Sequence, residues 1–314
     1  MSTQPGAVAA IEASGLRRTF GDVVAVDGVD LDVPSGAVLG LLGPDGAGKS
    51  TLIRMLATVL RPDSGDARVQ GFSVTRQAAK VTPRIGYMSQ KFALYPDLSV
   101  AENIEFFARL RGVPPAERKQ RADQLLTGMG LAEFVDRQAG RLSGGMKQKL
   151  FLATTLMHRP EVLLLDEPTT GVDPVSRREF WRILADLHRS GTTVLVATPY
   201  MDEAERCTDV VFLDGGRVRH RGSPAEIKAL LPGRLFELRT AEPRAALATI
   251  QRLPGVLAAH LYGDLVRLLF DGDAAAAEAA LAAAGVTGDV RAAAVDMETA
   301  FAVLAELSRE EAAR

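Results

Sequence analysis

The chain of 314 residues lacks the features that mark several classes of protein. It has a single cysteine, Cys207, which excludes an internal disulfide framework, and we expect a packed thiol in a helix there. No apolar run approaches the roughly 20 residues of a membrane helix, and residues 1–10 lack the order of a secretory signal. We therefore expect a cytoplasmic protein that reaches a membrane only through a partner.

A strongly basic region is also missing. The net charge is -2, and the arginines are spread along the chain rather than grouped into a tract. Nothing in the charge pattern therefore favours nucleic acid as a partner.

The length and composition fit a globular protein of two domains. The chain is 47% apolar and 24% charged, and its composition shifts after Gly222-Ser223-Pro224. This shift predicts a first domain over residues 9–222 and a second over residues 223–314.

The first domain alternates between strand-like and helical segments. Two β-branched stretches, 23–26 and 29–33, precede a continuous apolar run at 38–42, which predicts a strand buried on both faces. Strands return at 162–165 and 193–196 around a helix at 176–189, as in a parallel sheet, and 210–218 indicates a hairpin.

Between the strands, residues 90–158 have a helical pattern and predict a helical subdomain. Ser99 and Glu102 form a capping box that opens a helix ending at Gly112. Its predicted apolar face consists of Ile104, Phe107 and Leu110. Residues 115–127 are charged and helical in composition.

The second domain has the pattern βαββαβ. The predicted strands are 235–239, 256–261, 265–270 and 289–294, and the predicted helices are 243–252, 274–284 and 297–308. This order favours a small ferredoxin-like α+β domain. It contains no recognisable metal-ligand cluster or catalytic constellation, so we expect a dimerisation or regulatory module.

The segment from Gly43 to Ser50 follows the buried strand and matches the phosphate-loop pattern Gly-x-x-x-x-Gly-Lys-Ser. Its glycines let backbone N–H groups converge on phosphates, and the helix that follows adds its partial positive charge. We expect Lys49 to reach the β- and γ-phosphates and the Ser50 hydroxyl to bind Mg²⁺. A glycine-rich turn without a ligand is the alternative, which the matching context disfavours.

A second apolar strand, 162–165, delivers Asp166 and Glu167 to its carboxyl end, where ligands of open α/β sheets bind. We expect Asp166 to hold Mg²⁺ through water and Glu167 to act as general base for the attacking water. An apolar strand that ends in Asp-Glu is weak evidence for a nucleotide site by itself, but it is strong evidence when it is paired with the phosphate loop.

Just upstream lies Leu142-Ser143-Gly144-Gly145-Met146-Lys147-Gln148. Together with the two preceding motifs, this segment makes residues 9–222 resemble the nucleotide-binding subunits of ABC transporters. The resemblance implies an α/β fold with a P-loop NTPase (RecA-like) core, an antiparallel β subdomain and a helical subdomain. It also implies that Ser143, Gly144 and Gly145 bind the γ-phosphate held by the opposite subunit of a head-to-tail dimer.

The resemblance assigns further roles. Gln90 corresponds to the glutamine that senses Mg²⁺, Phe20 to the aromatic that stacks on adenine, and Asp173 to a loop that communicates across the dimer. A core phenylalanine is a serious alternative for Phe20. Residues 91–112 should supply the groove that grips the membrane subunit. The residues expected to contact ATP or Mg²⁺ are Phe20, Gly43, Pro44, Asp45, Gly46, Ala47, Gly48, Lys49, Ser50, Thr51, Gln90, Ser143, Gly144, Gly145, Asp166, Glu167 and Asp173.

Two positions depart from the family pattern. Asp45 replaces the usual asparagine of the phosphate loop, and we expect a modest effect. Pro199 stands where the family usually has a histidine, and proline offers neither a side-chain donor nor a backbone N–H to the γ-phosphate. We expect ATP binding to persist and hydrolysis to be slow. The four histidines of the chain do not lie at this position, and we expect them to be structural or exposed.

The segments Leu16-Arg17-Arg18-Thr19-Phe20-Gly21 and 200–205 resemble the drug- and antibiotic-export branch. Such subunits are similar to daunorubicin-resistance ATPases and work with ABC-2 type permeases at the inner face of the membrane. The resemblance also implies that two ATP-binding subunits pair with each other, as a homodimer or a heterodimer. Three alternatives are a soluble ABC ATPase of translation or repair, a non-hydrolysing ATP-binding switch and a P-loop kinase.

Overall fold

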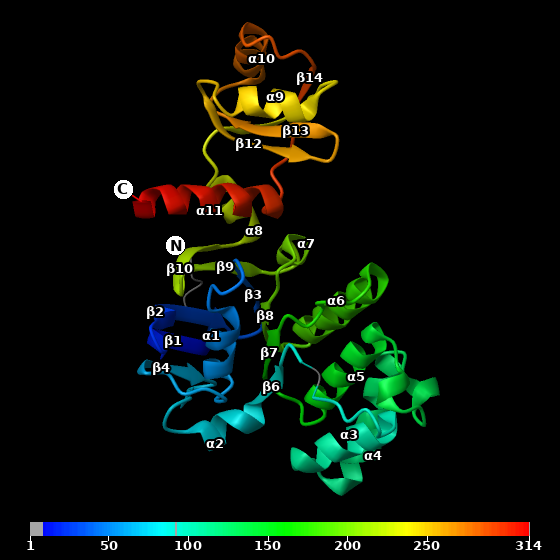
Figure 1. The fold of residues 1–314 in the computed structure, drawn as a ribbon. Helices are drawn as coiled ribbons and strands as arrows, with labels where there is room; N and C mark the ends of the chain where they lie inside the picture. The colour runs from blue at the N-terminus through cyan, green and yellow to red at the C-terminus, as the bar shows by residue number, and fades with distance from the viewer. Residues whose placement is uncertain (1–8, 92, 314) are drawn as a thin grey trace. The chain divides into compact units, whose positions relative to one another are not determined.

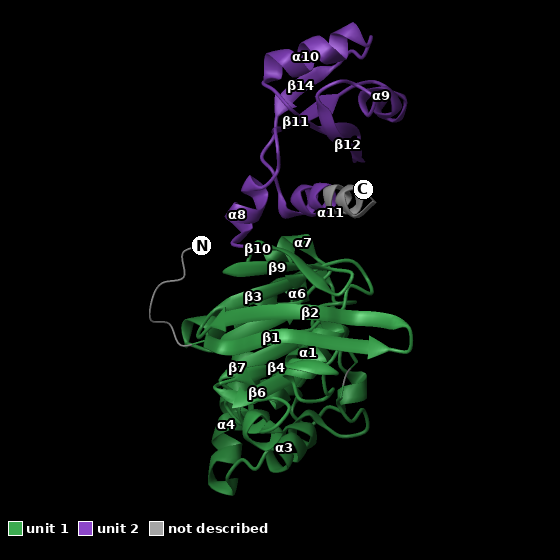
Figure 2. Cartoon of the chain, turned by 90° about the vertical axis from the view of Figure 1, so that its left-hand side faces the viewer, with its two compact units in different colours: residues 1–221 green, residues 222–314 purple. Residues whose placement is uncertain are grey.

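The structure, a computed structural model, describes residues 9–91 and 93–313. The chain divides into two compact units, Met1–Arg221 and Gly222–Arg314 (Figure 2). The division falls one residue before the boundary expected from the composition. The first unit contains two sheets and the second contains one, and each unit has its own apolar core.

An antiparallel sheet of four strands forms one layer of the first unit. Its order is β2-β1-β4-β5, with β1 at Ala9–Phe20, β2 at Val23–Pro34, β4 at Ser64–Val69 and β5 at Phe72–Ser73. The two short strands expected at 23–26 and 29–33 are wrong as separate elements. Gly28 has φ +68° within β2, so the glycine is absorbed as an irregularity of one long strand rather than forming a turn.

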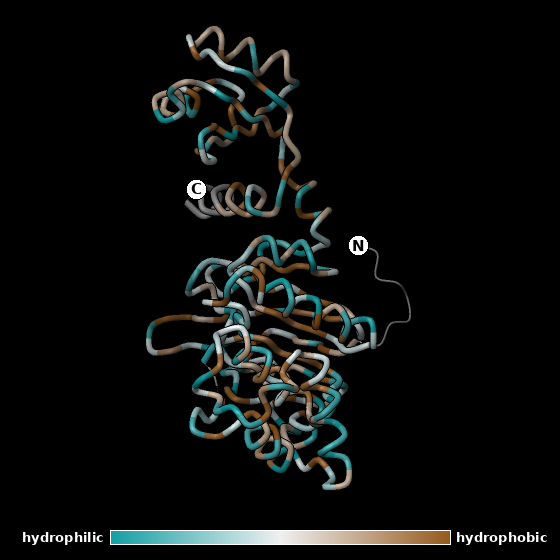
Figure 3. Tube along the Cα trace, turned by 90° about the vertical axis from the view of Figure 1, so that its right-hand side faces the viewer, coloured by the Kyte–Doolittle hydropathy of each residue, from teal (hydrophilic) through white to brown (hydrophobic). Residues whose placement is uncertain are grey.

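The second layer is a sheet of six strands in the order β10-β9-β3-β8-β7-β6. From β9 to β6 all neighbouring strands are parallel, and β3, β7 and β8 are buried along their whole length. Figure 3 shows brown, hydrophobic stretches running through this unit. The strands are β3 (Val38–Leu42), β6 (Ile85–Met88), β7 (Val162–Asp166), β8 (Thr193–Ala197), β9 (Asp209–Asp214) and β10 (Arg217–Gly222).

Helices cover both faces of this parallel sheet. In Figure 1, α1 (Lys49–Leu56) lies between the two sheets and α6 (Pro174–Arg189) lies on the opposite face. One apolar core joins α1 to both sheets, with Leu52, Ile53 and Leu56 fully buried in it. The buried strands thus carry the loops at their carboxyl ends on a rigid support.

A helical subdomain is inserted between β6 and β7. It contains α3 (Val100–Leu110), α4 (Pro115–Gly128) and α5 (Gly144–Leu156), with the short 3₁₀ helices η2 (Ala132–Phe134) and η3 (Ala139–Arg141). A short helix α2 (Ala78–Val81) and η1 (Thr82–Arg84) precede β6.

The capping box of Ser99 and Glu102 is present at the start of α3. The predicted apolar face of this helix is wrong at Leu110, which is 66% exposed, because the packed side of the helix consists of Val100, Ile104 and Ala108. Leu110 is the last residue of the helix and lies only two positions after Ala108, so its side chain points to a different face.

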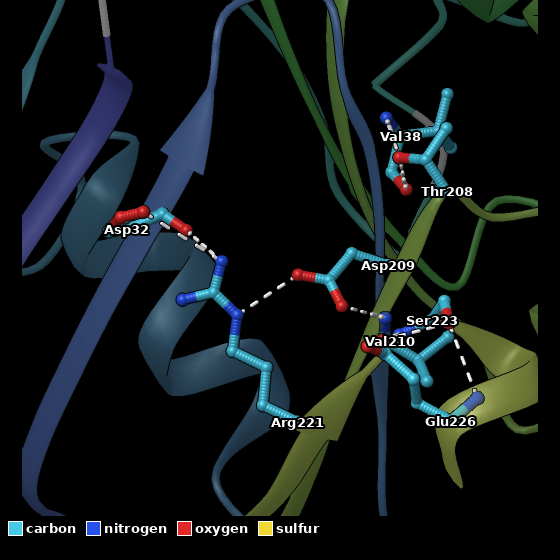
Figure 4. Close-up of polar contacts among 8 residues, drawn as sticks. All are labelled: Asp32, Val38, Thr208, Asp209, Val210, Arg221, Ser223 and Glu226. Carbon is cyan, nitrogen blue, oxygen red and sulfur yellow. Dashed lines mark hydrogen bonds and ion pairs between the residues drawn. The ribbon is translucent and has the colours of Figure 1, made fainter. Parts of the chain in front are cut away.

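The end of the first unit is fixed by Arg221 in β10. Its Nε donates to Asp209 Oδ2 at 3.0 Å, and its guanidinium also reaches the Asp32 carbonyl oxygen at 2.6 Å (Figure 4). The last strand is thereby tied to β9 and β2. A helix α7 (Met201–Ala204) precedes β9, and the helix expected around Cys207 ends before that residue, which lies in the following turn.

The second unit begins with α8 (Pro224–Ala229), opened by a capping box of Ser223 and Glu226. Its sheet has the order β12-β13-β11-β14, antiparallel throughout, which is the order of a split β-α-β arrangement. The elements are β11 (Arg234–Arg239), α9 (Pro243–Ile250), β12 (Val256–Tyr262), β13 (Leu265–Phe270), α10 (Ala274–Ala283), β14 (Asp289–Ala292) and α11 (Met297–Ala313). Among the described helices, none combines the length and apolar character needed to cross a bilayer.

Candidate nucleotide-binding site

The phosphate loop joins the buried strand β3 to α1, as its sequence predicts. Gly43 and Gly48 have φ +149° and +103°, backbone conformations that L side chains rarely adopt. A Cβ at either position would lie 2.2 Å from a carbonyl oxygen, that of Leu213 or of Ala25. Glycine is therefore required at both positions for the loop to fit against its neighbours. This requirement is separate from the close approach of a phosphate to the loop backbone.

Lys49 is buried at the start of α1. Its Nζ donates to the carbonyl oxygens of Gly43 at 2.8 Å and Pro44 at 2.9 Å, so the loop curls around its own ammonium group. A phosphate in this loop would meet a positive charge whose position is already fixed. Asp45, by contrast, is exposed.

Ser50 and Asp166 meet across α1 and β7. Ser50 Oγ donates to Asp166 Oδ1 at 2.7 Å, while the buried Asp166 Oδ2 has no hydrogen-bond partner among the described residues. Burial raises the pKa of Asp166, against the opposing effects of the Ser50 hydrogen bond and the Arg54 charge. A buried carboxylate oxygen without a partner next to a hydroxyl fits Mg²⁺, which prefers hard oxygen ligands.

Glu167 follows β7 and lies beside Gln90. Gln90 Nε2 donates to Glu167 Oε2 at 3.0 Å, and Thr170 Oγ1 donates to the same oxygen at 3.2 Å. Glu167 has φ +51°, which is uncommon for a residue with a side chain, and its backbone N–H bonds the Ala197 carbonyl. The chain therefore turns sharply at Glu167, and such strained positions are concentrated at functional sites.

The Ser-Gly-Gly segment opens α5, and its three residues differ in role. Ser143 caps the helix by accepting a hydrogen bond from Met146 N, and both Ser143 and Gly144 are exposed. Gly145 is buried, and a Cβ there would lie 2.3 Å from Ser176 Oγ of α6. Two residues are thus open to a ligand, while the third allows close helix packing.

Asp173 caps α6 by accepting hydrogen bonds from Val175 N and Ser176 N, and the hydrogen bonds from Ser176 lower the pKa of Asp173.

Phe20 is 48% exposed at the end of β1, with the Arg18 guanidinium 5.0 Å from its ring centroid. The alternative of a core phenylalanine is therefore wrong, and stacking on adenine stays a prediction.

Pro199 follows β8 and is exposed, so no side-chain donor projects from this position. The residue before it, Thr198, donates from Oγ1 to the fully buried Glu203 at 2.5 Å, and Thr169 Oγ1 donates to the same carboxylate at 2.7 Å. Sequence reasoning missed Glu203. It is one of several acids in a short polar segment, and a single sequence carries no sign of which one turns inward.

These features define a nucleotide-binding cassette, with a phosphate loop, an acidic strand end and a Ser-Gly-Gly helix start on one α/β framework. A model of the ABC transporter family matches residues 26–170. The chain belongs to the family of ABC transporter ATP-binding proteins, which are ABC-type ATPases.

Three comparisons document this membership. The chain is 44% identical over 270 residues to the Escherichia coli (strain K12) protein named Probable multidrug ABC transporter ATP-binding protein YbhF, covering 85% of this chain and 47% of that protein. It is 42% identical over 265 residues to the Daunorubicin/doxorubicin resistance ATP-binding protein DrrA of Streptomyces peucetius, covering 84% and 80%. The structure of cbiO1 from Clostridium perfringens, part of the ABC transporter complex cbiONQ, matches with a TM-score of 0.65 and 30% identity over 71% of this chain and 91% of that one. The chain spans about half the length of YbhF.

Proposed function

We propose that this chain is the ATP-binding and ATP-hydrolysing subunit of an ABC-2 type exporter that removes drugs, antibiotics or lipid-like molecules. The observation that carries the proposal is the meeting of Ser50, Asp166, Gln90 and Glu167 beside the phosphate loop. The multidrug and daunorubicin-resistance names of two relatives support the exporter branch.

In this proposal, each of the chain's site residues has one task. The phosphate loop and Lys49 bind the phosphates of ATP, and Phe20 stacks on adenine. Ser50 and Asp166 hold Mg²⁺, which neutralises phosphate charge when it is bound. Glu167 takes a proton from the attacking water, and Gln90 fixes the position of the Glu167 carboxylate.

The second half of the site comes from another ATP-binding subunit, identical or different. Ser143 and Gly144 are exposed at the start of α5, where N–H donors are available to the γ-phosphate of the opposite subunit. ATP stabilises the closed dimer because its phosphates contact both subunits only in that state.

An exposed aromatic cluster on the helical subdomain is the proposed contact with the permease. Tyr95 and Phe106 stack edge to face with ring centroids 4.7 Å apart, and Leu110 is exposed on the same helix as Phe106. Exposed apolar clusters of this kind mark protein–protein contacts. The chain would thereby be held at the inner face of the membrane.

The test is a pull-down of the tagged chain from solubilised membranes, followed by identification of co-purified proteins. We expect an ABC-2 permease, and we expect Phe106→Asp to lose it while Val59→Asp, a change of another exposed apolar residue, retains it. Recovery of ribosomal or repair proteins in place of a permease would reject the exporter role.

A second candidate function is an ATP-binding switch with little hydrolysis, and only the exposed Pro199 favours it. Loss of one positioned catalytic donor costs roughly 10²–10³ in rate. We rank a slow ATPase first, because Lys49, Asp166 and Glu167 are all present.

A further inference from the structure

The carboxylate of Glu167 is held by hydrogen bonds on one of its two oxygens. Gln90 Nε2 donates to Oε2 at 3.0 Å, and Thr170 Oγ1 donates to the same Oε2 at 3.2 Å. The described residues form no hydrogen bond to Oε1. The two oxygens of this carboxylate are therefore not equivalent, and Oε1 is the one that remains available to a new donor.

A tight turn brings Thr170 back to Glu167. The N–H of Glu167 donates to the Ala197 carbonyl oxygen at 3.0 Å, which ties the turn to the end of β8. The N–H of Thr170 donates to the Glu167 carbonyl oxygen at 3.3 Å and closes the turn. Because residues with side chains rarely adopt the φ of +51° seen at Glu167, this conformation depends on such contacts.

The preceding residue, Thr169, anchors the turn to the interior of the first unit. Thr169 is 1% exposed, and its hydroxyl donates to the fully buried Glu203 at 2.7 Å, whereas Thr170 is exposed. The two threonines thus donate to different carboxylates, one in the interior and one at the site. Since the loop is already fixed by Thr169, little further entropy is lost when the Thr170 hydroxyl is held beside Glu167.

Threonine suits this position for two reasons. Its branched Cβ restricts rotation about χ1, so the hydroxyl has few alternative places. A hydroxyl also donates one hydrogen bond, and each carboxylate oxygen accepts about two. Thr170 and Gln90 together therefore fill the acceptor positions of Oε2, and those of Oε1 are left for water.

We propose that Thr170 is a positioning residue for ATP hydrolysis, which with Gln90 holds Oε2 of Glu167 so that Oε1 is the basic oxygen. This inference rests on the proposed function of Glu167. Oε1 takes one proton from water while the water oxygen bonds to the γ-phosphorus and the bond from that phosphorus to ADP breaks. Thr170 transfers no proton, and it acts only by keeping the carboxylate in place.

The test compares Thr170→Val, which has a similar shape without the donor, with Thr170→Ser, which keeps the hydroxyl. We expect Thr170→Val to lower kcat about fivefold, as for loss of one neutral hydrogen bond, and to leave KM for ATP within about twofold. Thr170→Ser should recover most of the lost turnover. Steady-state phosphate release by the full-length protein with Mg²⁺ measures both constants, and Thr127→Val, at an exposed threonine of α4, is the matched control.

A general loosening of the loop is separated from positioning by the Glu167→Gln background. A glutamine at position 167 cannot take the proton, so its placement no longer affects the rate. Thr170→Val should therefore change the residual turnover of Glu167→Gln by less than about twofold. Loosening of the loop would lower this residual turnover as much as it lowers that of the unsubstituted protein.

The outcomes distinguish this inference from the proposed function. If the unsubstituted protein does not hydrolyse ATP, or if Glu167→Gln hydrolyses it normally, the proposed function fails and the role of Thr170 fails with it. If Glu167→Gln is impaired while Thr170→Val has normal kcat, only the role of Thr170 is overturned. It is also overturned if Thr170→Ser is as slow as Thr170→Val, or if Thr170→Val acts equally strongly in the Glu167→Gln background.

Discussion

The hydroxyl of Thr198 donates to the buried carboxylate of Glu203 at 2.5 Å, immediately before Pro199. Thr169, two residues after Glu167 in the chain, donates to the other oxygen of the same carboxylate at 2.7 Å. One buried side chain thus joins the loop that follows β7 to the loop that follows β8. We infer that Glu203 fixes the position of Pro199 relative to Glu167.

Replacement of Glu203 by alanine should lower the free energy of unfolding by about 2–4 kcal/mol, because two buried hydroxyls lose their acceptor. Glu203→Gln keeps one acceptor oxygen and should lower the free energy of unfolding by less. Urea denaturation measures the free energy of unfolding of both variants. Asp202→Asn is the control, since Asp202 is exposed in the same helix and its change should fall within about 0.5 kcal/mol of zero. Equal effects of the Glu203→Ala and Asp202→Asn changes would contradict the role of Glu203.

A histidine at position 199 should raise the rate of ATP hydrolysis. Pro199 offers no donor, and an imidazole there would supply one toward the γ-phosphate, worth roughly 10²–10³ in rate when it is well placed. The measurement is steady-state turnover of Pro199→His with saturating ATP and Mg²⁺. Pro199→Ala separates the gain of an imidazole from the loss of proline rigidity, and it should stay slow. Unchanged turnover in Pro199→His would show that the rate is limited elsewhere.

Loss of the Glu167 carboxylate should remove hydrolysis while retaining ATP binding. Gln90 lies 3.0 Å from Glu167, and a glutamine at position 167 can keep a hydrogen bond to it but cannot take a proton. We expect Glu167→Gln to lower turnover at least about 10²-fold and to accumulate ATP-bound dimers, seen by size-exclusion chromatography with ATP. Glu161→Gln, at an exposed carboxylate just before β7, is the control. Normal turnover of Glu167→Gln would exclude Glu167 as the base.

The parts of the fold that the sequence predicted best are those where one local pattern decides the structure. The apolar run at 38–42 is buried on both faces, and Ser99 with Glu102 forms the predicted capping box. The strand, loop and helix around Gly43–Ser50 and the buried strand that ends at Asp166 were predicted for the same reason, since their residue types follow one another in a fixed order.

The features that sequence reasoning missed depend on contacts between distant segments. Gly28 lies within a long strand because the residues before and after it in the chain both pair with β1. The local sequence around Gly28 does not specify this pairing. The link from Glu203 to Thr169 spans 34 residues, and Gly145 is needed because α6 passes close to α5. Such pairs are set by packing of the whole domain.

Cys207 should resist alkylation in the folded protein. Burial, with the nearby charges of Glu203 and Asp209, raises the pKa of its thiol to about 12, so about 10⁻⁴ of it is thiolate at pH 8. Iodoacetamide should label native protein very slowly and guanidinium-unfolded protein readily, as measured by intact mass. Ser190→Cys, at an exposed helix end, provides a fast-reacting control within the same fold. Rapid labelling of native Cys207 would contradict its burial.

Arg267 should stabilise the second unit in a pH-dependent way. Its guanidinium bonds Asp296 at 2.7 Å and Glu237 at 3.0 Å, and lies 3.5 Å from the centroid of the Tyr262 ring. Burial acts to raise the pKa of Asp296, but hydrogen bonds from Thr299 and from Arg267 outweigh it and hold that pKa below its usual value. A lowered pKa means that the stabilisation is complete above the unfolded value near 3.8 and is lost as the pH falls through the lower folded value.

Asp296→Asn should therefore reduce the protection of α11 from hydrogen exchange at pH 7, by about 1 kcal/mol once solvent screening of the partly exposed carboxylate is allowed for. The difference from the unsubstituted protein should shrink as the pH falls from about 5 to 3, after correction for intrinsic exchange rates. Asp289→Asn is the control, because Asp289 is an exposed residue of β14 whose partner is the exposed Arg291. A difference that stays constant with pH would mean that the charge of Asp296 does not hold this helix.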